Sequence, residues 1–272
     1  MTVDELLIEY LDEQIELAQN LDGSYAELWG HIKDLVLRGG KRLRPRLVVQ
    51  TYERFGGQNI YNLIPIAAAW EMLHVGLLIL DDIMDGDLER RGEPTIEAIY
   101  GDSGVALLAG SLCISAANEL VLNSVLTLTS KVNIMSLLQD CYKETIGGQL
   151  LDIDPKKHDP LKVAEHKTAA YSYVGPMLSG AMAAGAQDED LLTIRQHGIT
   201  QGIIFQLQND LDDVEQDLLA GRHSSVIQAM EDLGSLAEAK EAIQKLIITL
   251  AEREGFEPSM ELPPYRLSKA AH

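Results

Sequence analysis

Residues 77–95 read LLILDDIMDGDLERRGEPT, and the fold prediction starts from this stretch. It completes a segment, 62–84, that is apolar nearly all round, as is typical of a helix at the centre of a large bundle. At about 100° per residue, Asp81 and Asp85 lie about 40° apart on one helix face, with Asp82 beside them. Carboxylates crowded at the end of an apolar helix repel one another, and a divalent cation removes that repulsion. The stretch therefore predicts a site for Mg²⁺, which needs only one or two protein carboxylates plus substrate phosphates.

Two adjacent arginines, Arg90 and Arg91, follow the acids and precede a Gly-Glu-Pro turn. Paired guanidinium groups beside a metal site are suited to clamp a diphosphate. His74 lies seven residues before Asp81, nearly in register with it on a helix, which makes His74 a candidate phosphate contact. A solvated acidic helix end is the simpler explanation of the acids, but negative charge at a helix C-terminus opposes the helix dipole.

The rest of the chain also has helical periodicity, and no run alternates at period two for long enough to form a sheet. Glycine and proline clusters separate the segments, and there is neither an internal repeat nor a low-complexity linker. The sequence predicts an all-α protein with a single domain over residues 1–272. The long helical segments expected beyond residue 100 are 103–127, 131–151, 161–184 and 188–219.

Composition narrows the class of protein. The net charge of −20 argues against a nucleic-acid partner, because phosphate backbones require clustered Lys and Arg. The N-terminus is an acidic amphipathic stretch rather than a secretion signal, and no run of about 18 uninterrupted apolar residues is present. A cytoplasmic protein without a transmembrane segment is expected.

A local basic cluster stands out against the acidic background. Residues 37–45 read LRGGKRLRP, so Lys41, Arg42 and Arg44 follow a double glycine and enter a helix. A glycine turn with several cations is suited to bind an anion.

A second acidic cluster lies in residues 202–213, GIIFQLQNDLDD. Gln206, Asn209 and Asp213 share one helix face, and Asp210 and Asp212 flank it. Two acidic helix faces in one helical protein predict a pair of metal sites facing each other. Farther upstream, Lys167 and Thr168 open another apolar helix, where Lys167 can supply one more cation.

Together these motifs resemble the trans-type polyprenyl diphosphate synthases. The similarity runs in order along most of the chain: GGKRLRP at 39–45, E-x-x-H ending at His74, DDIMD with DLERRGEPT, GGQLLD at 147–152, KT at 167–168 and FQ at 205–206. One DDxxD match is common by chance, whereas this ordered series is not.

The resemblance implies a reaction in which isopentenyl diphosphate joins an allylic diphosphate, pyrophosphate leaves, and Mg²⁺ ions, three with substrate bound, hold the diphosphate. It implies a large antiparallel bundle around a central active-site cavity, usually as a homodimer. Implied catalytic residues are Asp81, Asp82, Asp85, Lys167 and Gln206. Implied metal ligands are Asp81, Asp82, Asp85, Asn209, Asp210 and Asp213. Implied contacts of isopentenyl diphosphate are Lys41, Arg44, His74 and Arg91, and those of the allylic diphosphate are Arg90, Lys167, Thr168, Gln206 and Arg222.

The resemblance also places the growing chain beside the residues four and five positions before Asp81, which are Leu77 and Gly76. Neither residue is aromatic, so a product of twenty carbons or more is expected.

Two departures from the family pattern leave other readings open. The second motif begins with Asn209 instead of Asp, and Arg222 and Ser224 replace the Lys and Thr of a later loop that is also short. A peptide-modifying prenyltransferase of the same fold and a subunit of a heteromeric synthase are the alternatives to a chain-elongating synthase. A terpene cyclase has no use for GGKRLRP. The complete set of isopentenyl-diphosphate residues and the intact first motif favour elongation.

Overall fold

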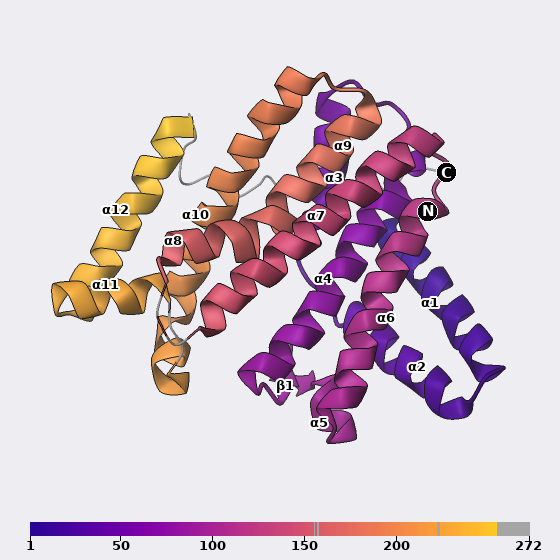
Figure 1. Cartoon of the computed structure of the whole chain (residues 1–272), viewed down its shortest axis with the longest axis horizontal. Coiled ribbons are helices and arrows are strands. Elements are labelled where there is room, and N and C mark those ends of the chain that lie inside the picture. Colours follow the sequence, from indigo (N-terminus) through magenta and orange to yellow (C-terminus); the bar gives the residue numbers. More distant parts are fainter. Residues whose placement is uncertain (155, 157, 222–223, 255–272) are drawn as a thin grey trace, which may run out of the picture. The chain divides into compact units, whose positions relative to one another are not determined.

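The computed structural model describes residues 1–154, 156, 158–221 and 224–254, and it is almost entirely helical (Figure 1). The all-α prediction is confirmed. Contacts within the chain define two compact units, one of residues 1–138 and 176–187, the other of residues 139–175 and 188–272. Helix α7 (Leu128–Ile153) contributes residues to both units. That the whole chain acts as one domain stays a prediction.

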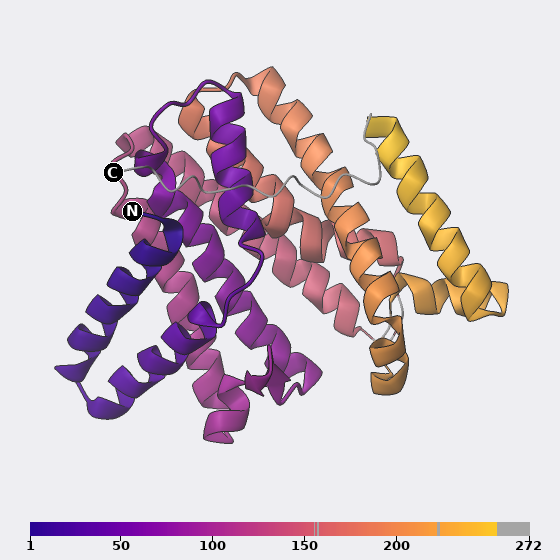
Figure 2. The same cartoon turned by 180° about the vertical axis from the view of Figure 1, so that it is seen from behind.

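The first unit is built around two apolar helices that lie side by side in both cartoon views, α4 and α6 (Figures 1 and 2). They approach closely because each has a glycine at the contact: a Cβ added to Gly76 would lie 3.0 Å from the Gly110 carbonyl oxygen. Trp70 is fully buried and donates from Nε1 to Ser179 Oγ at 2.9 Å, which ties α4 to α9. The elements of this unit are α1 (Val3–Gln19), α2 (Gly23–Leu37), α3 (Leu43–Arg54), η1 (Ile60–Leu63), α4 (Ile64–Asp85), β1 (Glu89–Arg90), β2 (Glu93–Pro94), α5 (Ile96–Tyr100), α6 (Ser103–Leu122), the first part of α7, and all but the first residue of α9 (Gly175–Ala184).

The second unit has its own apolar core, which α10, α11 and α12 share. Leu207 and Val214 of α10 pack with residues of α11 and α12, and all of these core side chains are at most 9% exposed. The elements of this unit are the last part of α7, α8 (Pro160–Val163), the π-helix η2 (Ala164–Val174), α10 (Asp188–Ala220), α11 (Ser225–Leu233) and α12 (Leu236–Glu254).

Two segments, Ile60–Asp85 and Ser103–Leu122, are long and apolar enough to cross a membrane on length and composition alone. The most apolar part of the first is 72% buried inside the protein, as in core helices of soluble proteins, which satisfy the same criterion. The pattern is therefore weak evidence for a membrane span.

Candidate functional site

The acidic end of α4 is set by Gly86. This residue adopts φ 68°, a left-handed conformation that suits glycine, and its N–H donates to the Asp82 carbonyl. The three carboxylates predicted as metal ligands then differ in environment. Asp82 is buried at 2% exposure, Asp81 is half-buried and Asp85 is exposed. Asp81 and Asp85, one helical turn apart, are therefore the carboxylates that solvent and ligands can reach.

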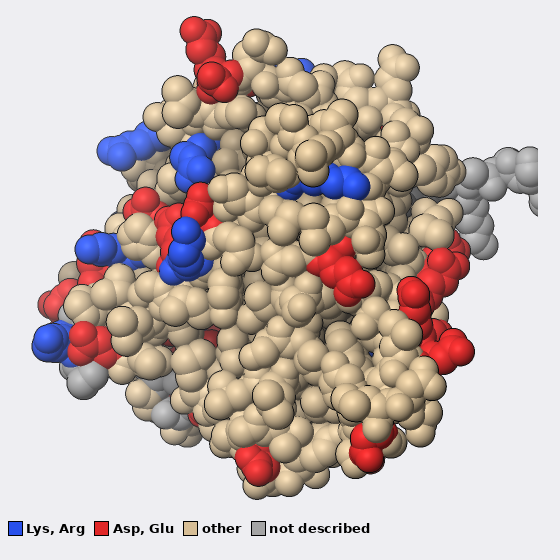
Figure 3. Space-filling view, turned by 45° about the vertical axis from the view of Figure 1, so that its right-hand side comes forward, with Lys and Arg blue, Asp and Glu red and all other residues tan. Residues whose placement is uncertain are grey.

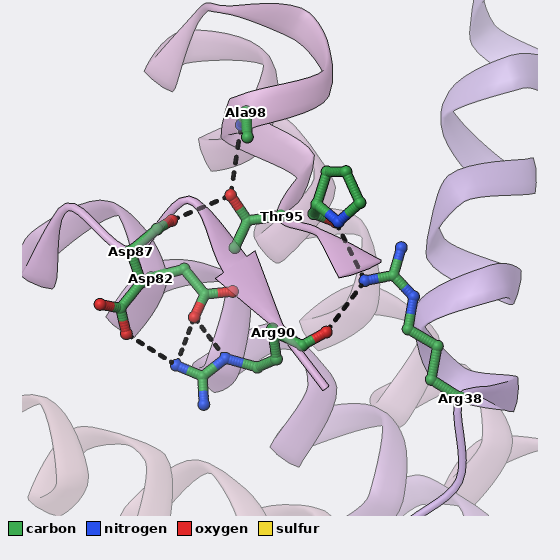
Figure 4. Close-up of polar contacts among 7 residues, drawn as sticks. Arg38, Asp82, Asp87, Arg90, Thr95 and Ala98 are labelled. Carbon is green, nitrogen blue, oxygen red and sulfur yellow. Dashed lines mark hydrogen bonds and ion pairs between the residues drawn. The ribbon is translucent and has the colours of Figure 1, made fainter. Parts of the chain in front are cut away.

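Asp82 is engaged by Arg90, which comes from strand β1 (Figure 4). Arg90 Nε donates to Asp82 Oδ1 at 2.5 Å, Nη2 contacts the same oxygen, and Nη2 lies 3.4 Å from Asp87 Oδ2. Burial raises the pKa of Asp82 to about 6, although the hydrogen bond and charge of Arg90 act in the opposite direction. Asp82, predicted as a metal ligand, here holds the arginine predicted to bind the allylic diphosphate.

A short hairpin carries Arg90 and Arg91. Strands β1 and β2 pair antiparallel, and the two residues between them, Arg91 and Gly92, have φ of 58° and 79°. Positive φ at both central residues is the mark of a type I′ turn, which is uncommon for arginine. Arg38 braces the hairpin by donating to the Arg90 carbonyl at 3.3 Å and the Pro94 carbonyl at 2.9 Å (Figure 4).

The hairpin contacts the glycine loop before α3. Arg91 Nη1 donates to the Gly39 carbonyl, and a Cβ added to Gly40 would lie 3.0 Å from Arg91 Nη2. Gly40 has φ 142°, so its backbone conformation favours glycine. The predicted basic loop and the predicted arginine pair therefore meet, although about fifty residues separate them.

Arg42 organises the loop from inside. It adopts φ 46° and donates to Asp4 Oδ1 at 2.8 Å, to the Val36 carbonyl at 2.8 Å and to Glu71 Oε1 at 2.6 Å. Glu71 is 2% exposed, so this ion pair is largely inside the protein. The sequence placed Arg42 among the basic residues without giving it a role. The E-x-x-H spacing marked Glu71, but nothing local indicated that the two residues pair.

His74 lies within electrostatic range of four arginines. Burial and the positive charges of Arg44, Arg91, Arg90 and Arg42, in that order of effect, hold its pKa well below the usual range of histidine. A neutral imidazole can offer hydrogen bonds but no positive charge. The predicted isopentenyl-diphosphate residues His74, Arg44 and Arg91 lie within electrostatic reach of one another, and the structure joins Arg90 and Arg42 to them.

In the second unit, Lys167 and Thr168 lie on the π-helix η2, where the sequence predicted an ordinary helix. Two glycines make the close packing of η2 possible: a Cβ on Gly148 would lie 2.2 Å from the Lys167 backbone nitrogen, and one on Gly202 would lie 2.4 Å from Ala169. π-Helical turns are frequent at functional sites. Lys167 Nζ lies 2.6 Å from Asp152 Oδ2, at the end of the GGQLLD motif.

In the second acidic cluster, as in the first, one carboxylate is buried and another is exposed. Asp210 is buried and accepts hydrogen bonds from Gln206 and Ser225, whereas Asp213 is exposed and Asn209 is half-buried. Gln206 also accepts from Thr168 Oγ1 at 2.6 Å, so these two predicted substrate contacts adjoin. Arg222, predicted to bind the allylic diphosphate, lies outside the described residues.

The carboxylates available at this site suit Mg²⁺ better than they suit a metal ion whose ligands all come from the protein. Within the parts of the chain that the structure describes, no three His, Cys, Asp or Glu side chains are grouped so that they could hold a metal ion. Asp81 and Asp85 offer hard oxygen atoms from one helix face, and Mg²⁺ completes its shell with water and phosphate.

Gly76 and Leu77 were predicted to border the growing chain. Leu77 is 9% exposed. A Cβ on Gly76 would lie 3.0 Å from both the Gly110 oxygen and the Cys113 Cβ. The space beside Gly76 is therefore occupied by α6, although Gly76 was predicted to border the growing chain. A larger residue at 76 would disturb helix packing, and of the two positions only Leu77 remains a candidate determinant of product length.

Comparison with known proteins places the chain in a family. The family model described as polyprenyl synthetase matches residues 26–223. A short chain isoprenyl diphosphate synthase of Methanocaldococcus jannaschii is 32% identical over 222 residues, 80% of this chain and 66% of that protein. A geranylgeranyl diphosphate synthase of Methanosarcina mazei is 32% identical over 218 residues, 74% of this chain and 66% of that protein. The chain thus spans just under two thirds of the length of both relatives.

The fold agrees as well. A crystal structure of geranyltransferase from Helicobacter pylori, complexed with magnesium and isoprenyl diphosphate, superposes with a TM-score of 0.72 at 25% identity. The match covers 93% of this chain and 91% of that one.

Proposed function

Because the chain belongs to the polyprenyl synthetase family, we propose that it condenses isopentenyl diphosphate with an allylic diphosphate and releases pyrophosphate. The observation that carries this proposal is the group of four arginines around His74, close to the accessible carboxylates Asp81 and Asp85 in the chain. Carboxylates compensate part of this charge, because Arg42 pairs with Asp4 and Glu71 and Arg90 pairs with Asp82 and Asp87. A cationic group of this size in a protein of net charge −20 still favours an anionic ligand. A diphosphate matches its charge and its arginine geometry.

Isopentenyl diphosphate would be bound by Lys41, Arg44, His74 and Arg91. The arginines supply charge and directed hydrogen bonds, and neutral His74 adds a hydrogen bond without repelling them. Arg42 has no direct role, because its contacts to Asp4 and Glu71 already engage it.

As ligands of Mg²⁺ we propose Asp81 and Asp85 in the first acidic cluster, and Asn209 and Asp213 in the second acidic cluster. When bound, Mg²⁺ neutralises the diphosphate and stabilises the charge that develops as it leaves. This role is supported by the donor set and by the magnesium in the Helicobacter pylori enzyme. The number of ions, three, stays a prediction.

The allylic diphosphate would be bound by Lys167, by Arg90 and by Gln206. Arg90 Nε and Nη2 are used by Asp82 and Asp87, which leaves Nη1 for the substrate. As the allylic C–O bond breaks, its electron pair stays on pyrophosphate and these donors stabilise the new charge. The double bond of isopentenyl diphosphate then attacks the allylic cation, and the proton that is lost passes to pyrophosphate.

A twenty-carbon or longer product is supported by the related geranylgeranyl diphosphate synthase and by the absence of an aromatic side chain at Leu77.

We further propose a homodimer formed through one face of the first unit, the α6 apolar face. It consists of exposed side chains on α6 and the turn into α7, and most of them are half exposed or more. The surface on this side has a wide central area with few charged side chains (Figure 3). Large apolar surface of this kind marks interaction sites, and most soluble homo-oligomers are two-fold dimers. The face comprises Leu107, Leu108, Leu122, Val125, Leu128 and Val132. Light scattering tests this proposal, with Leu108→Asp expected to give a monomer.

A cytoplasmic location is proposed with the dimer, since the more apolar of the two long helices is mostly buried and the α6 face would be covered.

The catalytic proposal is tested by incubating the protein with labelled isopentenyl diphosphate, Mg²⁺ and dimethylallyl, geranyl or farnesyl diphosphate in turn. Elongated products are then separated by thin-layer chromatography. No elongation with any primer would refute the proposal and direct attention to transfer onto a peptide or to a missing partner subunit.

A further inference from the structure

The second acidic cluster contains a carboxylate whose oxygens are already occupied. Asp210 is 8% exposed. Its Oδ1 accepts from Gln206 Nε2 at 2.8 Å, and its Oδ2 accepts from the Ser225 N–H at 2.9 Å and the Ser225 hydroxyl at 2.6 Å. Asp213, one turn later, is exposed instead. Asp210 is therefore unlike a metal ligand, although the family pattern places it among them.

The Ser225 contact makes Asp210 the cap of α11. Ser224 is the N-cap residue of this helix by position, but its side chain makes no capping hydrogen bond. The Ser225 N–H is one of the first-turn donors that a helix leaves unsatisfied. Asp210 satisfies it from fifteen residues upstream, and its negative charge suits the helix N-terminus. The start of α11 is thus fixed by α10.

The Gln206 contact sets the direction of a hydrogen-bond chain. A carboxylate only accepts, so Asp210 requires the amide nitrogen of Gln206 to face it. The amide oxygen must then face Thr168, whose hydroxyl donates to it. The single proton of Thr168 is thereby used, and the second N–H of Gln206 is the donor left for a substrate.

We propose that Asp210 is a positioning residue and not a metal ligand. It fixes the N-terminus of α11 and orients the Gln206 amide, so that Gln206 and not Thr168 donates to the allylic diphosphate. The part that concerns substrate rests on the proposed function. The part that concerns α11 does not.

The first experiment measures thermal unfolding of Asp210→Asn, Ser225→Ala and the double variant, with Asp212→Asn as the control. Asp212 is exposed and accepts a hydrogen bond from Gln208 of the same helix. We expect Asp210→Asn and Ser225→Ala each to lower Tm by ~3–8 °C, with a double variant short of the sum, because the hydroxyl bond that Ser225→Ala removes is one of the bonds that Asp210→Asn weakens. Should Asp210→Asn fail to fold, Ser225→Ala alone gives the comparison with Asp212→Asn.

The second experiment measures steady-state kinetics and the Mg²⁺ concentration for half-maximal rate. Asp210→Asn should keep this concentration within about twofold of wild type, whereas Asp213→Asn should raise it by about tenfold or more. The KM for the allylic diphosphate should rise ~3- to 10-fold in Asp210→Asn, as for one misplaced hydrogen bond, with the KM for isopentenyl diphosphate unchanged.

A readout without turnover is the gain in Tm on adding Mg²⁺ with inorganic pyrophosphate. Asp210→Asn should keep this gain. A tenfold higher Mg²⁺ requirement or loss of the gain in Asp210→Asn would overturn the proposal, as would a Tm equal to that of Asp212→Asn. If the wild-type protein shows neither turnover nor a gain, the proposed function fails, and the unfolding data still decide whether Asp210 caps α11.

Discussion

Gly148 and Gly147 are adjacent on α7, yet a methyl group at the two positions meets different surroundings. An alanine Cβ at 148 would lie 2.2 Å from the Lys167 nitrogen, where ordinary contact begins at 3.4 Å, while a Cβ at 147 meets nothing within 4 Å. Gly148→Ala therefore forces η2 to move by about 1 Å, which costs about 1–3 kcal/mol of stability as overpacking. Alanine returns up to about 1 kcal/mol through its helix propensity, a gain that Gly147→Ala receives without the clash.

The catalytic effect should be larger than the effect on stability. A displacement of about 1 Å at a group that binds the substrate costs about 10²-fold in kcat/KM, and Lys167 is the group displaced. Urea unfolding followed by circular dichroism gives the stability of both variants, and initial rates at varied allylic diphosphate give kcat/KM. We expect Gly147→Ala to be slightly more stable than wild type and fully active. If Gly148→Ala behaves like Gly147→Ala in both assays, η2 does not depend on this glycine and the reasoning is refuted.

Other predictions address the first unit. Chelation of Mg²⁺ should abolish turnover, and Asp85→Ala should lower kcat about 10³-fold or more; full activity in EDTA would exclude a metal role. Arg44→Ala should raise the KM for isopentenyl diphosphate and leave that for the allylic substrate unchanged, as two-substrate kinetics will show. The raised pKa of Asp82, about 6, means that the folded state holds its proton more tightly than the unfolded chain. The contribution of Asp82 to the free energy of unfolding is thus present at acid pH and lost as pH rises from about 4 through 6. Urea unfolding in EDTA should therefore show the wild type losing up to about 3 kcal/mol of stability relative to Asp82→Asn over that range. Leu77→Phe should shorten the product, measured by reversed-phase chromatography after dephosphorylation, and a wild-type product of fifteen carbons would contradict the length proposed.

Much of the fold could be predicted because hydrophobic period and helix-ending residues are local signals. The segments 62–84 and 188–219 correspond within a few residues to α4 and α10. The π-helix η2 could not be predicted in this way, because Gly148 and Gly202 create the space for it from other helices. A local pattern does not record which residues a distant glycine will meet.

The residues of the candidate site could be proposed from the sequence, whereas the contacts among them could not. Spacing and charge identified Asp82, Arg90 and Asp210, but each was assigned to a ligand. In the structure Asp82 pairs with Arg90 through a hairpin, and Asp210 caps a helix that begins fifteen residues later. Contacts between elements decide which carboxylates remain available to bind a metal ion or substrate. The spacing of residues in the sequence does not reveal these contacts.

The left-handed turn at Arg91 has a consequence for selection. A non-glycine residue with φ 58° costs about 1 kcal/mol or more, and glycine or asparagine would avoid this cost where it exceeds the loss of the Arg91 hydrogen bond to the Gly39 carbonyl. A library of variants at position 91 that is screened only for expression or heat resistance should therefore lose the arginine. A library screened for cell growth that depends on the enzyme's product should retain it. The residue found at position 91 would then show whether selection had acted on stability or on activity.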